Sequence, residues 1–397
     1  MLKATKVRLY PTAEQRNALS FQFGAARWVY NHALDWRNKA WKEDGERVTR
    51  RMTLDKLVEL KREEATAWLK EADSQVLQQS LMHLDDAFKR FFKMQARYPR
   101  HKVKRGKQSI SYPQRVKIVD GNSLYLPKVG NVKAVLHREI AGTIKTVTVS
   151  RSLTGKYYAS ILCDSGEVAP EAINDIEVHA VIGVDMGLSH LLITSEGYKE
   201  GNPRFFKQAE ANLRRKQRSL SRKMKGSANR NKARILVAKV HERVTNARND
   251  FQHKLSKRLI DDNQAVCVET LKVKNMLKNR KLARPIADAS WSELLRKLGY
   301  KAVWTGKHLV QVDPWFASSK TCSVCGACMA TMPLSVRTWQ CKSCGYEHDR
   351  DINAARNIRR QGLLKLKAAG LSVSACGGLR KTGLFPAAAC EAGSLAL

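Results

Sequence analysis

Two cysteine pairs near residue 330 constrain the fold of this chain more than any other feature of its sequence. Two residues separate the cysteines of each pair, and fifteen residues separate the pairs. This spacing is typical of a zinc ribbon, because each pair lies on a tight turn and presents two thiolates to one tetrahedral ion. A glycine, Gly326 or Gly345, follows each pair where such a turn is needed. The predicted zinc ligands are Cys322, Cys325, Cys341 and Cys344.

A zinc ion held by four cysteines has no open coordination position. We therefore expect this ion to be structural or to help hold nucleic acid, and catalysis to lie elsewhere. The sequence leaves open whether Cys328, a fifth cysteine in the cluster, competes as a ligand or is a free thiol. The nine cysteines are odd in number and five are clustered, which does not fit a secreted disulfide framework.

The charge of the chain points to a polyanionic partner. Lys and Arg number 72 against 36 Asp and Glu, a formal net charge of +36 over 397 residues. Such a charge destabilises a compact chain by self-repulsion unless counter-charge is bound, and nucleic acid supplies it. The cations are spread along most of the chain rather than gathered in one amphipathic helix, which argues against a membrane-surface protein.

Neither a signal peptide nor a membrane span is expected. The first residues lack an apolar segment, and no stretch approaches the roughly 18 apolar residues of a span. We expect a cytoplasmic, soluble protein with no membrane partner, built from two or three domains.

Sequence periodicity divides the chain into helical and strand-rich regions. Residues 3–10 alternate like a short strand, and residues 13–97 show helical spacing that begins with a capping box at 12–15. From 98 to 165 the pattern changes to short strands and turns, as in a small barrel or sandwich that the first strand can join. Residues 165–177 are acidic and are interpreted as a linker.

From residue 178 strands and helices alternate. The region contains a long basic helical stretch, further buried strands and, after the cysteine cluster, a last helix. The tail at 371–397 is rich in small residues and has no clear period, so it is predicted to be disordered.

Three acids lie at the ends of predicted strands and at the start of a predicted helix. Asp185 ends the apolar strand "AVIGVD", Glu269 ends "AVCVE", and Asp351 opens the last helix. Each has a simpler explanation, since strands often end in acids and Asp351 complements a helix dipole. Together they follow the order of the acids in the ribonuclease H-like fold, where three carboxylates bind two divalent metals roughly 3.5–4 Å apart. Mg²⁺ prefers such oxygen ligands.

The sequence does not settle the roles of two further acids near Asp351. Glu347 and Asp349 lie between the second cysteine pair and the last helix. Asp349 is either a group that supports the metal ligands or a solvated turn residue.

Several stretches, in order, resemble one family. They are "VRLYPTAEQ", "YPRHKVKRGKQSISYP", "IGVDMGLSHLLITSEG", "VETLKVKNM", "SSKTCSVCG" and "DRDINAARNI". From about residue 3 to 360 the chain resembles TnpB, the RNA-guided nuclease encoded by IS200/IS605-type transposons and related to Cas12 enzymes. The resemblance implies a guide RNA from the transposon end and a double-stranded DNA target. The chain departs from the common family pattern at Thr270, where members often have an acid, and at Ala317, where many have proline.

The resemblance also implies the architecture and the site. The fold class is α+β and multidomain, with a helical recognition lobe, a wedge-like β-barrel and a RuvC nuclease domain that carries a zinc-ribbon insertion. The catalytic and Mg²⁺-binding residues would be Asp185, Glu269 and Asp351, with two Mg²⁺ (Mn²⁺ as a substitute) and one structural Zn²⁺. The expected domains are 1–12 as the first barrel strand, 13–97 as the helical recognition domain, 98–170 as the remaining barrel, 178–314 as the first RuvC part with a basic helical insertion, 315–347 as the zinc ribbon, 348–370 as the final RuvC helix, and 371–397 as the tail.

Candidate nucleic-acid contacts are weaker predictions. Gln78 matches a family position near the target-adjacent duplex, where an amide can bond adenine; a solvated helix residue is the alternative. The basic helices are expected to face RNA or heteroduplex phosphates, and a solvated face is the alternative. Their candidate residues are Arg214, Arg215, Lys216, Arg218, Arg222 and Lys223. Three aromatic residues around the ribbon either stack on single-stranded bases or fill its core; they are Trp315, Phe316 and Trp339.

These observations predict an RNA-guided DNA endonuclease that reads a short target-adjacent motif and acts in the prokaryotic cytoplasm in association with the nucleoid. The alternatives are a DNA-binding transposition regulator or repressor with little nuclease activity, and a transposase. The three acids favour a nuclease over a regulator, and the lack of a separate catalytic Tyr or HUH motif argues against a transposase.

Overall fold

The computed structural model describes residues 1–333 and 335–374. They form two compact units, one over Met1–Val168 and one from Ala169 onward. Each unit combines a sheet with helices, which confirms the predicted α+β, multidomain class. No helix of the described residues is long and apolar enough to cross a membrane.

The first unit contains a seven-stranded antiparallel sheet in the order β2-β6-β7-β1-β5-β4-β3. Its strands are β1 (Leu2–Tyr10), β2 (Gln108–Tyr112), β3 (Lys117–Val119), β4 (Ser123–Leu126), β5 (Gly130–Val135), β6 (Thr143–Arg151) and β7 (Tyr157–Asp164). The first strand pairs with β5 on one side and β7 on the other. The N-terminal residues therefore lie inside the sheet that the later segment forms.

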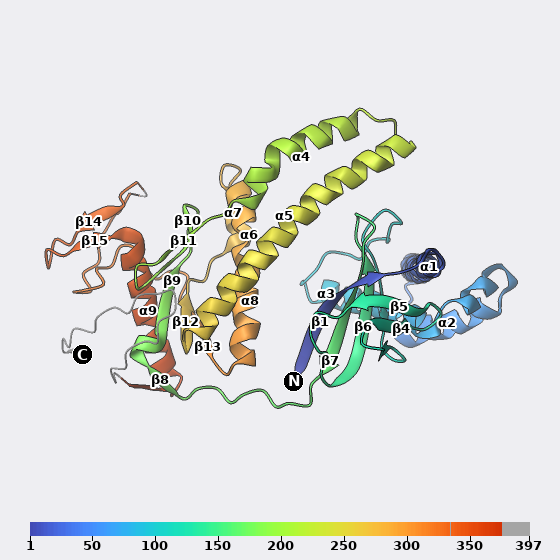
Figure 1. Cartoon of the computed structure of the whole chain (residues 1–397), viewed down its shortest axis with the longest axis horizontal. Helices are drawn as coiled ribbons and strands as arrows, with labels where there is room; N and C mark the ends of the chain where they lie inside the picture. The colour runs from blue at the N-terminus through green and yellow to red at the C-terminus, as the bar shows by residue number, and fades with distance from the viewer. Residues whose placement is uncertain (334, 375–397) are drawn as a thin grey trace. The chain divides into compact units, whose positions relative to one another are not determined.

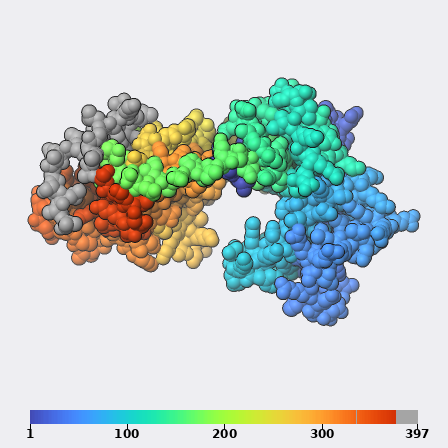
Figure 2. Space-filling view, turned by 90° about the horizontal axis from the view of Figure 1, so that it is seen from below, coloured from blue at the N-terminus to red at the C-terminus, as the bar shows by residue number. Residues whose placement is uncertain are grey.

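Helices connect β1 to β2. They are α1 (Ala13–Glu43), α2 (Arg50–Arg62), the 3₁₀ helix η1 (Glu64–Glu71) and α3 (Ser74–Phe92). The predicted capping box of α1 is confirmed: the Gln15 backbone N–H donates to the Thr12 hydroxyl, and the Thr12 backbone N–H donates to the Gln15 side chain. Leu19 and Phe23 of α1 pack in one core with Val147 and Ile161 of the sheet, so helix and sheet share a core. On the surface of this unit the helical segment, in blue, adjoins the sheet strands, in blue-green (Figure 2).

The second unit is built on a five-stranded sheet in the order β11-β10-β9-β12-β13. The strands β9, β12 and β13 are parallel, whereas β10 and β11 run antiparallel to their neighbours. The bounds are β9 (Val181–Asp185), β10 (His190–Thr194), β11 (Lys199–Gly201), β12 (Ala265–Val268) and β13 (His308–Gln311).

Helices cover both faces of this sheet. They are α4 (Phe205–Ser221), α5 (Ala228–Asp261), α6 (Val273–Met276), α7 (Ala283–Ala289), α8 (Trp291–Trp304) and α9 (Arg350–Ala368). Ile182 and Val266 face a core with α5 and α8, and Val181 and Cys267 face a second core with α9. Alternate strand residues point to opposite faces, so α9 lies on the side of the sheet opposite α5 and α8. Helices α4 and α5 pair as a hairpin that projects beyond the sheet (Figure 1).

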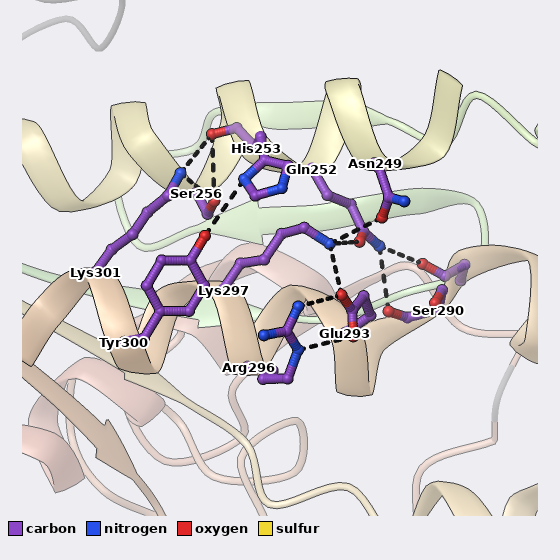
Figure 3. A network of polar contacts seen from close by, with 11 residues as sticks. Asn249, Gln252, His253, Ser256, Ser290, Glu293, Arg296, Lys297, Tyr300 and Lys301 are labelled. Atoms are coloured by element: carbon purple, nitrogen blue, oxygen red, sulfur yellow. Dashed lines mark hydrogen bonds and ion pairs between the residues drawn. The ribbon is translucent and has the colours of Figure 1, made fainter. Parts of the chain in front are cut away.

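A polar network joins α5 to α8 (Figure 3). The Lys297 side chain is only 1% exposed, and its ammonium donates to Asn249 Oδ1 at 3.2 Å, Gln252 Oε1 at 3.1 Å and Glu293 Oε1 at 3.0 Å. Three acceptors match the three N–H donors of an ammonium, which is the condition for burying such a charge without a large penalty. The Gln252 amide also donates to the backbone oxygens of Ala289 and Ser290, at the start of α8.

Two segments differ from the sequence prediction. Asp175–Glu177, within the expected linker, forms β8, and Ser372–Ser374, within the expected disordered tail, forms β16 in parallel with it. Ile176 is buried in a core against which Leu371 and Val373 pack, so apolar burial accounts for the pairing at the start of the tail. Residues 375–397, the rest of the predicted tail, lie outside the described residues.

The ribbon also ends later than expected. Its hairpin strands are β14 (Thr338–Gln340) and β15 (Glu347–Asp349), and α9 follows immediately at Arg350. The predicted boundary at 347 therefore cuts through a paired strand.

Candidate active site and zinc ribbon

Strand register brings the first two acids together. β9 and β12 are parallel neighbours in which Val184 pairs with Val268. Asp185 and Glu269 are the next residues of the two strands, so they lie side by side at the carboxyl edge of the sheet. Both side chains are half-buried, and their carboxyl groups are within hydrogen-bonding reach of each other.

Helix α9 delivers the third acid to the same edge. It crosses β9 closely at Gly183, where an added Cβ would lie 2.0 Å from the backbone oxygen of Ala355. It crosses β12 closely at Gly362, where an added Cβ would lie 2.0 Å from Cys267 Sγ. These two contacts fix the helix on the sheet. Asp351 lies in its first turn, where the helix dipole favours a negative charge.

The electrostatics of this edge favour a bound cation. Burial raises the pKa of Asp185 well above its usual range, and the neighbouring carboxyl groups of Glu269 and Asp351 raise it further. Burial also raises the pKa of Glu269, although the Ser318 hydroxyl donates to its Oε1 at 2.9 Å and opposes that shift. Oxygen donors that crowd together at a desolvated edge suit a hard divalent cation.

Asp351 does not form one tight cluster with the other two acids. Among the described residues, one group of three or more His, Cys, Asp or Glu side chains has all its donor atoms within 4.8 Å of one another. That group is the four ribbon cysteines and does not include the acids. Asp351 instead pairs with the Arg337 guanidinium of the ribbon, 3.4 Å from each carboxylate oxygen. The Arg337 guanidinium balances the negative charge of the Asp351 carboxylate, as a bound metal ion would. Binding a metal to Asp351 would therefore weaken or replace this ion pair.

Of the two interpretations that the sequence left open for Asp349, the structure agrees with a supporting group rather than a solvated turn residue. Its carboxylate caps α9, accepting from the backbone N–H groups of Asp351 at 3.0 Å and Ile352 at 3.1 Å. It also pairs with Lys199 at 2.6 Å, which together with the helix N–H groups lowers the pKa of Asp349. Its neighbour Glu347 is exposed on β15. Asp349 thus orients the turn that carries Asp351.

The four predicted zinc ligands converge. Cys322 Sγ lies 3.7 Å from Cys344 Sγ, and Cys325 Sγ lies 3.6 Å from Cys341 Sγ. Around a tetrahedral ion with Zn–S bonds of about 2.3 Å, neighbouring sulfurs are about 3.8 Å apart, so the cluster fits zinc without rearrangement. The exposed Cys328 lies outside this group, and its thiol donates a hydrogen bond to the backbone oxygen of Met329.

His348 is a ribbon residue that the sequence interpretation overlooked. It is 2% exposed, its Nε2 lies 3.0 Å from Cys322 Sγ, and its ring packs against Trp339 with centroids 4.7 Å apart. An imidazole N–H that donates to a ligand sulfur steadies a metal site. The only sequence signal was a histidine four residues after the last cysteine pair.

Two buried asparagines connect the ribbon to α9. Asn353 Oδ1 accepts from the Ser323 backbone N–H at 2.9 Å, and its amide donates to Thr321 O at 2.8 Å. Asn357 donates to Ser318 O at 2.8 Å and to Thr321 O at 2.6 Å. Ser318 also donates to Glu269. Hydrogen bonds therefore connect three parts of the unit: the segment 318–325 that carries the first cysteine pair (the first cysteine knuckle), α9, and the sheet edge that carries Asp185 and Glu269 (the acidic edge).

The remaining predicted residues lie as follows. Gln78 is exposed on α3, and Lys216 is half-buried on α4. The other basic candidates are exposed in the second half of α4 or just beyond its end; they are Arg214, Arg215, Arg218, Arg222 and Lys223. Trp339 belongs to the ribbon core and is 7% exposed, whereas Trp315 is 82% exposed with the Lys272 ammonium 4.3 Å from its ring centroid. At the departure from the family pattern, the Thr270 hydroxyl donates to Val312 O at 2.6 Å.

Three family descriptions match successive parts of the chain. Residues 1–46 match a "Helix-turn-helix domain" of the OrfB_IS605 type, residues 166–280 match OrfB_IS605, described as "Probable transposase", and residues 291–358 match "Cas12f1-like, TNB domain". The last match spans α8, the ribbon and the start of α9.

Two relatives match over nearly their whole length. A Streptomyces pristinaespiralis protein is 44% identical over 379 residues, covering 94% of this chain and 91% of its own. InsQ of Escherichia coli K12 is 34% identical over 401 residues, covering 96% of each chain. Both carry the name "Putative RNA-guided DNA endonuclease". A Cas12f1 chain, solved with its sgRNA and target DNA, shares the fold with a TM-score of 0.54 at 14% identity, covering 90% of this chain and 98% of its own.

Proposed function

Because the chain belongs to the TnpB family of RNA-guided DNA endonucleases, the OrfB proteins of IS605-type elements, we propose that it cuts double-stranded DNA selected by a bound guide RNA. The observation that carries the proposal is the register of β9 and β12. It places Asp185 beside Glu269 at the sheet edge that α9 reaches with Asp351. Two strand ends and one helix start, distant in sequence, thereby present three carboxylates on one side of the unit.

The catalytic residues of this proposal are Asp185, Glu269 and Asp351, which would hold two Mg²⁺ ions. When bound, such a pair of ions supplies an activated water and stabilises the leaving oxygen of the phosphodiester. The chain supplies the geometry: strand register fixes Asp185 and Glu269, the Ser318 hydroxyl orients the Glu269 carboxylate, and the Asp349 cap orients the first turn of α9.

The ribbon cysteines Cys322, Cys325, Cys341 and Cys344 would hold one structural Zn²⁺. Their sulfur–sulfur distances of 3.6 and 3.7 Å support this assignment. Zinc there would maintain the knuckle whose backbone accepts from Asn357 and whose Ser318 reaches Glu269. The ion would therefore act on catalysis through the protein.

The nucleic-acid partners would be a guide RNA and its DNA target. Base pairing with the guide would read most of the target, and the protein would read a short adjacent motif. Bound RNA would also provide the counter-charge for the net +36 of the chain. Exposed cations at the tip of the α4–α5 hairpin, such as Arg218 and Arg222, would meet phosphates.

The proposal is tested by expressing the chain together with its flanking DNA, sequencing the RNA that co-purifies, and supplying a matching duplex with Mg²⁺. We expect one RNA species and cleavage only of duplexes that match its end. A protein that retains no defined RNA, or that binds the matching duplex without cutting it, would favour a DNA-binding regulator.

A further inference from the structure

We propose that a cleft along α1 binds an unpaired nucleotide of a nucleic-acid strand, with the base against aromatic side chains and the backbone on an adjacent basic loop. The cleft has a volume of about 540 Å³ and lies wholly within the first unit, between α1 and η1. Its lining includes Phe21, Gly24, Arg27, Trp28, Asn31 and Trp68. A volume of this size falls within the range of ligand pockets and accommodates a mononucleotide. The proposal does not depend on the nuclease chemistry.

Three aromatic rings hold one another in place in the cleft. Trp68 of η1 meets Phe21 edge-on at a centroid distance of 6.0 Å and Trp28 at 5.7 Å. The His32 ring stacks on Trp28 at 4.8 Å. All four rings are half-buried, so they are fixed by packing yet remain partly accessible. Fixed, accessible rings are the usual platform for an unstacked base.

Gly24 supplies an independent argument. It lies inside the 31-residue helix α1, where glycine costs about 1 kcal/mol relative to alanine. Its φ is not left-handed, and the nearest neighbour that an added Cβ would meet among the described residues is the Arg27 guanidinium at 4.0 Å. Neither backbone conformation nor packing within the described protein requires glycine at this position. Since Gly24 lines the cleft, a bound molecule against α1 would explain it.

The adjacent basic loop, residues 97–107, contains six Lys and Arg and no acid. All six residues are exposed; they are Arg97, Arg100, Lys102, Lys104, Arg105 and Lys107. The Lys102 ammonium, however, lies 4.0 Å from the centroid of the Tyr30 ring, and burial lowers the pKa of Lys102 to about 8. The loop is tied to the cleft lining rather than free. Asn31 donates to Lys102 O at 3.0 Å and accepts from Lys102 N at 2.8 Å, and Asp35 meets His101 at 2.7 Å. Gln108 accepts from Arg27 at 2.9 Å while its amide donates to carbonyls of the loop.

The same side chains thus line the cleft and hold the basic loop, so the aromatic rings and the cations keep a fixed spacing. A free mononucleotide would engage only part of this surface, because six cations spread over eleven residues match several successive phosphates. We therefore assign the cleft to a strand rather than to a free nucleotide. An unpaired base can come from RNA or from displaced DNA, and the experiment separates these sources.

The test uses the full chain, freed of nucleic acid, and single strands of about 12 nucleotides, a length within the site sizes of single-strand binders. Oligouridine and oligodeoxythymidine probes carry one photoreactive 5-iodouracil, and a matched duplex carries the same group. We expect crosslinks to peptides that contain Trp28 or Trp68 with a single strand and not with the duplex. Preference for the RNA probe would identify guide RNA as the source, and preference for the DNA probe would identify a displaced strand.

Variants separate binding from folding. Gly24→Leu fills the cleft, yet leucine is a better helix former than glycine. We expect the variant to keep or raise the melting temperature and to bind the preferred strand at least about fivefold more weakly at raised salt, the loss of one stacked base. Gly24→Ala, with a smaller effect in the same direction, serves if the leucine variant unfolds. Gly201→Ala is the control outside the cleft, because an added Cβ there meets nothing within 4 Å. Unchanged binding by both Gly24 variants, or equal crosslinking of the duplex, would overturn the proposal.

Discussion

Replacing Gly183 by alanine tests how the acidic edge is assembled without touching an acid. The added Cβ would lie 2.0 Å from the backbone oxygen of Ala355 and 2.7 Å from the backbone nitrogen of Arg359. Ordinary contact begins at 3.4 Å, so the first distance is 1.4 Å too short. β9 is held between β10 and β12, and the two nearest of the obstructing atoms are backbone, so α9 must move.

The size of the effect follows from that displacement. Overpacking of a well-packed core costs about 1–3 kcal/mol of stability, and a 1 Å misplacement of a reacting group can cost about 10²-fold in rate. Asp351 moves with α9 while Asp185 and Glu269 stay on the sheet. We therefore expect cleavage of a guide-matched duplex to fall by about 10²-fold, with a lower melting temperature and nearly normal target binding.

The assay compares Gly183→Ala with wild type and Gly201→Ala for cleavage in Mg²⁺, for melting temperature and for target binding in a gel shift. The Gly201 control adds the same methyl group in open space. If Gly183→Ala cuts at the wild-type rate and melts normally, then α9 does not fix the position of Asp351 as described here.

Three further predictions concern metals and ionisation. Cys344→Ser should release zinc, as measured by elemental analysis, and should reduce cleavage. Cys328→Ser should retain about one zinc per chain, and loss of zinc from this variant would refute the proposed set of ligands. Hydrogen bonds from Arg296 and Lys297 lower the pKa of Glu293 to about 2. Its ion pairs should therefore stabilise the protein above about pH 4.5 and lose that contribution as the pH falls toward 2, so Glu293→Gln should melt earlier at neutral pH and lack this acid-dependent loss. Lys297→Met should also melt earlier, because it leaves the side-chain oxygens of Asn249 and Gln252 without their donor. Burial and neighbouring carboxyl groups raise the pKa of Asp185 well above its ordinary value of 3.8. Without added Mg²⁺ the wild type should therefore lose stability as the pH rises above that ordinary value, and Asp185→Asn should lose less; equal pH profiles by calorimetry would contradict this.

The parts of the site that depend on local sequence pattern could be predicted from the sequence. Paired cysteines with ribbon spacing predicted a cluster whose sulfurs do converge. Asp185 and Glu269 follow apolar strands, and parallel strands end at the same edge of a sheet, so their proximity could be anticipated. Their roles as metal ligands, with Asp351, stay predictions.

The contacts that the sequence did not reveal join distant segments through single side chains. Nothing in the local pattern of Asp349 indicates a cap that also meets Lys199, or that Arg337 would pair with Asp351. Asn353 and Asn357 are hidden in an ordinary helical sequence, because only the packed ribbon supplies their partners. β8 and β16 have three residues each, too few for alternation to be recognised, so their pairing depends on tertiary burial.

The most direct test of the proposed nuclease compares Asp351→Asn with Asp349→Asn. Asparagine at 351 keeps the shape of the side chain and removes the charge, whereas asparagine at 349 still caps α9 through its side-chain oxygen. In guided cleavage of duplex DNA with Mg²⁺, we expect Asp351→Asn to lose cleavage while binding its target, and Asp349→Asn to be only mildly slower. Near-normal cleavage by Asp351→Asn, with or without loss in Asp349→Asn, would contradict the assignment of Asp351 as a catalytic metal ligand.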